Sequence, residues 1–329
     1  MSHKVQTMVS GSGIKPWHGL GTIVEGMMTS KECIEKAGLS WQVSKVPVEY
    51  SFKKDTVNVK HEKYDGKFIV VREDNGVGLG CVGGVYTPMQ NREAFSMIDE
   101  LVGTKEVCFE TAGALGQGER VWMAAKVQGL ITVRGVDPIE KYLFLSNSFD
   151  GKHLLSVGLT GTRIVCANTL QIATTEANKT GDIFKIRHSA KMGEKVEAAR
   201  EALGIINNRF EDFEALANRL ARVQVNTARL NEFIDQLGFD ADAEKGRQKG
   251  IVDDIKRAFE SSPGSNLVSA KGTMWGAVNS ISYLTTHERS TRVTSAFKSE
   301  EEARFAASLW GSGDALNQKA LQVATQMSA

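Results

Sequence analysis

The sequence has no long apolar run and no excess of either charge. No run approaches the roughly 20 residues that a membrane helix needs. Residues 1–5 also lack the charged-then-apolar pattern of a signal peptide. We therefore expect a cytoplasmic protein with no membrane partner. The 40 basic and 39 acidic side chains leave a net charge of +1, which argues against a surface that attracts polyanions everywhere.

Cysteine is also scarce. The four cysteines include no CxxC pair, so their spacing matches neither a zinc ribbon nor a disulfide framework. Cys81 and Cys166 lie in apolar stretches that resemble strands. We expect both to be buried, reduced thiols, the usual environment of a free cysteine.

Catalytic and cofactor motifs are missing as well. Residues 78–83 have the letters GxGxxG, but a dinucleotide site needs a helix directly afterwards, and Gly84 to Pro88 predict a strand or turn. No P-loop, HExxH or GxSxG occurs. We predict no cofactor, no metal and no catalytic residue. An enzyme site assembled from His153, Arg163 and Asn168 is the alternative, since catalytic groups are brought together by geometry.

The 329 residues suffice for about two domains. Short strand-like runs with tight turns fill residues 1–180; Asn75-Gly76, for example, is a strong hairpin signal. Short helices are expected from Thr29 or Ser30 to Gly38 and over 91–102. We predict an α+β protein whose N-terminal domain is an antiparallel β-meander with one or two short helices.

Residues 181–329 change to helical periodicity. Apolar residues with heptad spacing extend over 192–220 and predict a long helix packed on a partner helix. An intramolecular helical hairpin fits better than a dimeric coiled coil, because the flanking positions are only partly charged. Further helices are predicted at 227–237, 249–261, 271–288 and 300–310, and a last one with Asp314 as N-cap.

Local charge and aromatic residues select candidate binding residues. Residues 121–192 hold nine basic and five acidic side chains. Exposed loops on a rigid sheet often carry binding groups, and aromatic residues beside cations can stack bases and contact phosphates. The candidates for nucleic-acid binding are Trp17, His18, Lys152, Arg163, Phe184, Lys185 and Arg187. Each group has a plainer alternative. Trp17 could anchor the N-terminal arm onto the sheet, residues 147–169 could serve only to form turns and strand ends, and the basic residues of 179–191 could be an ordinary solvated charge run.

Arg163 is the sharpest of these candidates. Strand alternation puts Arg163, Val165 and Ala167 on one face, as expected for a surface half-covered by a partner. The alternative is a buried arginine, which would need a paired carboxylate. Asp150 is the candidate for that carboxylate.

Several segments together resemble a known family. They are residues 15–22, 86–95, 147–170, 274–288 and 308–313, which include Lys15-Pro-Trp-His-Gly-Leu-Gly-Thr22 and Ser308-Leu-Trp-Gly-Ser-Gly313. As a set they resemble the phage/plasmid-like family catalogued as domain of unknown function 932. The resemblance implies a gene of a phage, a plasmid or another mobile element. It implies no catalytic residue.

Two functions follow as hypotheses. The first is binding of single-stranded DNA in a bacterial host, with a role in strand annealing or recombination. Phage annealing proteins have a broadly similar β-then-α layout and form rings, so a homo-oligomer is expected by analogy of fold. The second is a protein-binding module that interferes with a host defence or replication factor. The near-neutral charge and the heptad pattern favour it.

Overall fold

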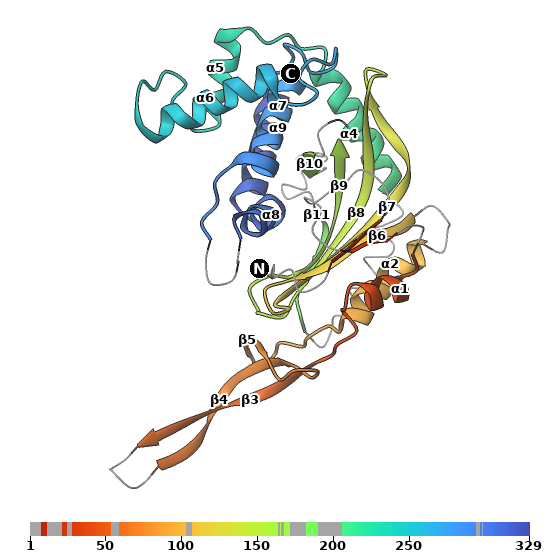
Figure 1. The fold of residues 1–329 in the computed structure, drawn as a ribbon, viewed down its shortest axis with the longest axis vertical. Coiled ribbons are helices and arrows are strands. Elements are labelled where there is room, and N and C mark those ends of the chain that lie inside the picture. Colours follow the sequence, from red (N-terminus) through yellow and green to blue (C-terminus); the bar gives the residue numbers. More distant parts are fainter. Residues whose placement is uncertain are drawn as a thin grey trace.

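A computed structural model describes most of the chain. The described residues are 8–11, 22–24, 28–53, 59–102, 107–163, 165, 168–171, 182–189, 206–293, 297 and 299–329. They form a large sheet, a smaller sheet that projects from it, and helices packed mainly against the large sheet (Figure 1). None of the helices described is both long and apolar enough to cross a membrane.

The large sheet has eight strands in the order β10-β9-β8-β7-β6-β1-β2, and β11 also pairs with β9. Its strands are β1 (Met8–Gly11), β2 (Thr22–Val24), β6 (Val107–Leu115), β7 (Arg120–Val133), β8 (Asp137–Ser148), β9 (Leu155–Arg163), β10 (Asn168–Gln171) and β11 (Asp182–Ile186). From β6 to β10 each strand pairs antiparallel with the next, which confirms the predicted meander. The pairing of β1 with β2 is parallel and was not predicted.

Helices cover both faces of this sheet. They are α1 (Ser30–Lys36), α2 (Asn91–Val102), α4 (Ile206–Leu220), α5 (Thr227–Gln236), α6 (Gly246–Ser261), α7 (Met274–Tyr283), α8 (Glu300–Trp310) and α9 (Ser312–Gln326); a π-helical turn, Leu284–Glu288, follows α7. Alternation directs Trp122 to one face and Met123 to the other. Trp122 packs with Phe305 of α8, whereas Met123 belongs to the larger cluster that includes residues of α1, α2 and α4.

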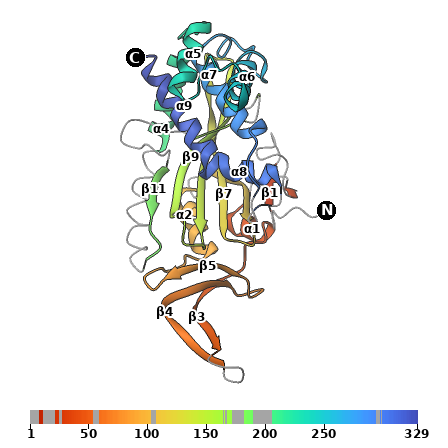
Figure 2. The same cartoon turned by 90° about the vertical axis from the view of Figure 1, so that its left-hand side faces the viewer.

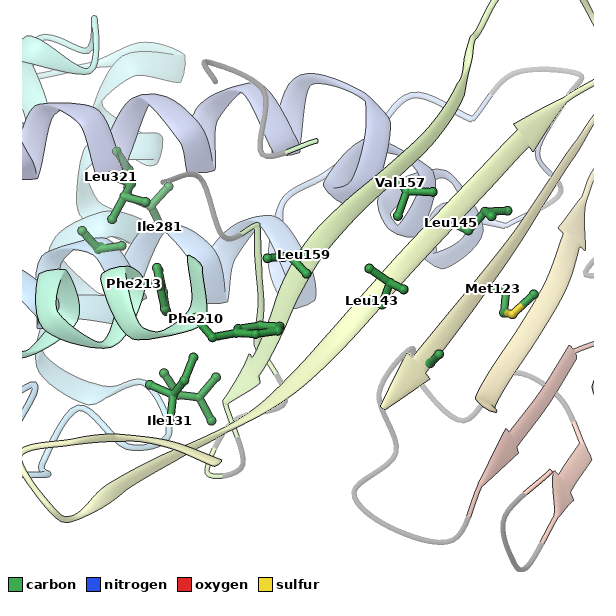
Figure 3. Close-up of a cluster of buried hydrophobic side chains, with 14 of the residues drawn as sticks. Met123, Ile131, Leu143, Leu145, Val157, Leu159, Phe210, Phe213, Ile281 and Leu321 are labelled. Carbon is green, nitrogen blue, oxygen red and sulfur yellow. The ribbon is translucent and has the colours of Figure 1, made fainter. Parts of the chain in front are cut away.

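The larger cluster joins the sheet to the C-terminal helices. Figure 3 shows Phe210 and Phe213 of α4 gathered with Ile131 and Leu159 of the sheet and with Ile281 of α7. All five are at most 2 % exposed. The helical half of the chain is thus held on the sheet by a continuous apolar core.

The smaller sheet has the order β3-β4-β5, built from β3 (Val43–Lys53), β4 (Val59–Arg72) and β5 (Gly78–Gly83). Asn75-Gly76 lies between β4 and β5, and Gly76 has a φ of +72°, which confirms the predicted hairpin. Pro47 lies within β3. A proline is tolerated there because β3 is an edge strand. The far halves of β3 and β4 form a two-stranded ribbon that extends beyond the rest of the described chain (Figures 1 and 2).

The two sheets meet where the β8–β9 turn contacts β5. A Cβ atom on Gly80 would lie only 2.4 Å from the Cα atom of Asp150, so this contact requires glycine. Phe149 is fully buried and its ring lies 5.3 Å from that of Trp41. Tyr86 donates a hydrogen bond of 2.7 Å from its hydroxyl to the Ser148 carbonyl. The letters GxGxxG therefore belong to a strand at a sheet junction, as their setting predicted.

The helix predictions are largely confirmed. Thr29 caps α1 in a capping box with Glu32, and Ser299 caps α8. Asp314 does not cap the last helix, which begins at Ser312. Gly311 alone separates α8 from α9, and a Cβ atom there would lie 3.0 Å from the Cα atom of Ala307, so this tight connection favours glycine.

The predicted heptad helix is described only in its second half, α4, since residues 190–205 lie outside the described residues. The longest helix described is α6, with 16 residues. The division into domains at 180/181 stays a prediction. β11, assigned from sequence to the second domain, pairs with β9 of the first.

One cysteine differs from expectation. Cys81 is exposed, whereas its neighbour Val82, which alternation places on the opposite face of β5, is buried. The prediction of a buried thiol was therefore wrong at this position. Cys166 lies outside the described residues.

Candidate functional site

Strand pairing brings four of the predicted binding residues to one end of the large sheet. β11 runs antiparallel to the start of β9, with Lys185 opposite Ser156 and Ile186 opposite Leu155. Phe184 and Arg187 are their immediate neighbours in the chain. Lys152 lies in the β8–β9 turn, three residues before Leu155. Segments about 30 residues apart in sequence thus form one basic edge.

The other predicted residues are not part of this edge. Arg163 ends β9 and pairs with Ile139 and Asn168. Eight residues separate it from Leu155, which corresponds to about 25 Å along a strand. Asp150 lies beyond the opposite end of β9, so the pairing of Arg163 with Asp150 considered from sequence was wrong. Trp17 and His18 lie outside the described residues.

Asp150 shapes the turn that carries Lys152. One of its carboxylate oxygens accepts hydrogen bonds from the Ser148 hydroxyl, at 2.5 Å, and from the Lys152 backbone N–H, at 2.9 Å. Gly151 follows with a φ of +73°, a conformation that glycine adopts without strain. The Lys152 side chain is 77 % exposed and its ammonium is 4.0 Å from Asp150. Lys152 is therefore held by its backbone, while its charge faces solvent.

A cavity of about 230 Å³ adjoins this turn. It lies between the β8–β9 hairpin and the junction of α8 with α9. Its lining residues are Phe144, Ser146, Lys152, His153, Leu154, Ser156, Gly158, Leu309, Trp310 and Asp314. The cavity is smaller than the roughly 300–1,000 Å³ of pockets for drug-sized ligands. Its size suits a single small group, such as one base, rather than a whole cofactor.

Of the aromatic residues that line the cavity, Trp310 is the one best suited to stack with a base. Its indole N–H donates to the Ser146 hydroxyl at 3.1 Å, which fixes the ring. The Arg120 guanidinium lies 4.7 Å from the ring centroid of Trp310, a cation–π arrangement. Sequence reasoning did not select either residue as a binding residue. The available signal was Trp310 itself, which lies in the Ser308 to Gly313 segment that carries the family resemblance.

His153 also lines the cavity. Burial lowers its pKa, as do the positive charges of Arg120 and Lys152, while Asp150 acts in the opposite direction. The imidazole is therefore neutral near pH 7. A neutral imidazole can both donate and accept a hydrogen bond, which matches the mixed edges of a base.

The charges at this end of the sheet favour an anion. Lys152 lines the cavity and Arg120 lies beside Trp310, with Asp150 and Asp314 as the carboxylates nearby. The β11 strand adds one lysine, Lys185, and one aspartate, Asp182, and Arg187 follows its end. Arg187 is exposed, as is Lys152. The arrangement can bind phosphate groups outside the cavity and accept a planar group within it.

A buried acidic cluster lies further along the same sheet. Lys126 is 2.5 Å from a carboxylate oxygen of Glu140 and 4.0 Å from Glu110. Tyr142 donates to the other Glu140 oxygen at 2.7 Å. Burial raises the pKa of Glu110. A lysine shared by two buried acids compensates their charge, and this suits a structural role.

The alternative enzyme site is not assembled. Arg163 and Asn168 pair at one end of β9, and His153 lies at the other. Asn168 is buried, and His287 is its side-chain neighbour at 3.1 Å. Among the residues described, no three His, Cys, Asp or Glu side chains are grouped so that they could hold a metal ion.

These observations define an α+β protein with a helix-covered, mainly antiparallel sheet and a small cavity at one end of that sheet. The family model for the domain of unknown function DUF932 matches residues 78–310. The chain belongs to this family, as its motifs indicated. No curated protein and no solved structure matches it.

Proposed function

We propose that this protein binds single-stranded DNA at the end of the large sheet where the β8–β9 turn meets β11. The observation that supports the proposal is the pairing of β11 with the start of β9, which places Lys185 opposite Ser156 of the cavity lining and Arg187 two residues further along the chain. Lys152 lines the cavity itself. Exposed cations can replace the counterions of the phosphates. An aromatic platform can hold bases without regard to their sequence.

Each group has a separate task in this proposal. Lys152 and Arg187 contact phosphates, and the released counterions supply most of the affinity. Trp310, fixed by Ser146, holds one base, and the neutral His153 forms a hydrogen bond with its edge. The family resemblance suggests a phage- or plasmid-carrying bacterium as the biological setting. A role in annealing or recombination follows only by analogy with the β-then-α layout of phage annealing proteins.

Fluorescence anisotropy with a labelled single-stranded oligonucleotide tests the proposal. We expect saturable binding at about 50 mM salt that weakens steeply as salt is added. Lys152→Ala and Arg187→Ala should each weaken binding and reduce the slope of log affinity against log salt by about one.

The control is Lys249→Ala, which removes an exposed lysine of α6 in the helical region. It should leave the affinity unchanged. Absence of saturable binding at low salt, or equal losses in the control and in Lys152→Ala, would contradict the proposal.

The competing function is binding of a host protein. The net charge of +1 favours it, since proteins that bind nucleic acids are usually more basic. A pull-down from nuclease-treated host lysate separates the two functions. Partners retained after nuclease treatment, with no oligonucleotide binding in the anisotropy experiment, would establish the competing function instead.

A further inference from the structure

The ribbon of β3 and β4 carries an apolar face that nothing in the described chain covers. Tyr50, Phe52 and Tyr64 are 48 %, 57 % and 55 % exposed. The ribbon extends away from the helices and the large sheet in both views (Figures 1 and 2). Isolated two-stranded ribbons are only marginally stable in water. An extended ribbon with exposed rings is therefore expected to pack on something.

The register assigns each residue to a face. Residues directly opposite in an antiparallel pair share a face. The pairs on the apolar face are Val48 with Tyr64, Tyr50 with Glu62 and Phe52 with Lys60. The pairs on the other face are Glu49 with Lys63, Ser51 with His61 and Lys53 with Val59. A 3.0 Å contact between the Ser51 hydroxyl and His61 Nδ1 agrees with this assignment.

The charges on the apolar face indicate which kind of partner can bind it. It holds one acid, Glu62, and one base, Lys60, two residues apart in β4. A face with no net charge and a carboxylate beside Tyr50 is a poor platform for a polyanion. It is instead complementary to itself, because a reversed copy offers a base to its acid and an acid to its base.

We propose that this face binds the same face of a second copy of the chain. The two ribbons pack face to face with their strands in opposite directions. The two-fold axis crosses the strands at right angles, between the pair Tyr50–Glu62 and the pair Phe52–Lys60. Tyr50 then faces Phe52 of the second copy, and Glu62 faces Lys60 of the second copy. Each contact occurs twice, as in any two-fold interface. With the axis parallel to the strands, Glu62 would instead face the ring of Tyr50.

The size of the contact predicts its strength. Tyr50 and Phe52, the two half-exposed rings of each copy that face the other copy, could bury roughly 400 Å² over both copies. This is well below the roughly 1,200–2,000 Å² of stable interfaces. The dimer is therefore weak and reversible, and the two bodies lie at opposite ends of the paired ribbons.

Charge exchange tests the proposal, with sedimentation equilibrium of the full chain over a concentration series without DNA. Lys60→Glu and Glu62→Lys should each weaken dimerisation at least tenfold, because two attractive contacts become repulsive. The double variant Lys60→Glu/Glu62→Lys should restore the wild-type affinity. Phe52→Ser should abolish the dimer.

Lys53→Glu is the matched control, since it makes the same charge change on the opposite face of the ribbon and should leave dimerisation unchanged. A wild-type chain that stays monomeric at every concentration would overturn the proposal. So would a double variant as weak as the single ones. Loss of oligonucleotide binding in Phe52→Ser, without a dimer in the wild type, would assign the face to nucleic acid instead. The sedimentation measurements contain no DNA, so the result for dimerisation is independent of the function proposed above.

Discussion

The large sheet and the β3–β4 ribbon follow the same alternation of side chains, yet their aromatic residues have opposite surroundings. Phe149, at the end of the large sheet, is fully buried against Trp41. Phe52, near the tip of the ribbon, is more than half exposed. Alternation decides which residues share a face in both cases. Whether that face becomes core or an outer surface depends on the layers that pack on it.

The largest expected effect tests this comparison directly. Phe149→Ala should lower the free energy of unfolding by about 3–5 kcal/mol, because it opens a cavity in a packed junction. Phe52→Ala should change it by less than about 0.5 kcal/mol. Chemical denaturation of the two variants gives both values. Equal losses would show that the ribbon face is covered within one chain.

A second prediction concerns the contact between the two sheets. Gly80→Ala should destabilise the protein by about 3 kcal/mol, because its Cβ would lie within 2.4 Å of the Asp150 backbone. Gly83→Ala, in the same strand, is the control, since a Cβ there meets nothing within 4 Å. Thermal unfolding compares the two. Gly80→Ala should also weaken oligonucleotide binding, because Asp150 shapes the turn that carries Lys152.

The smallest effect comes from His188, whose ring lies 4.9 Å from that of Tyr86 at the same junction. Burial lowers the pKa of His188 to about 4. The unfolded chain therefore takes up a proton below about pH 6.5, whereas the native protein excludes it until about pH 4. Stability should fall over this window as the pH drops, by about 2 kcal/mol between pH 7 and 4.5.

His188→Phe keeps the ring contact and removes the titrating group. Denaturation at several pH values should show a shallower loss of stability in this variant than in the wild type. Identical pH profiles would mean that His188 is accessible to solvent protons in the native state. In that case the junction is looser than the packing of the large sheet.

The sequence indicated many of the residues of the candidate site but not which of them lie close together in the fold. Lys152, Lys185 and Arg187 were selected because cations in loops and beside aromatics suit phosphates. Their convergence depends on β11 pairing with the start of β9. Pairing between strands so distant in sequence leaves no local pattern. Arg163 lies apart from them for the same reason. Trp310 was noted only as part of the family motif, because nothing in its local sequence indicates the cavity beside it.

Local chemistry determined the elements of this protein. Periodicity, Asn75-Gly76 and the caps Thr29 and Ser299 act over a few residues, so the sequence alone predicted the meander and most of the helices. Tertiary structure decided the parallel pairing of β1 with β2, the burial of Phe149 and the exposure of Cys81 and Phe52. Burial depends on which layer lies opposite a face, and that is set by contacts between segments far apart in the chain.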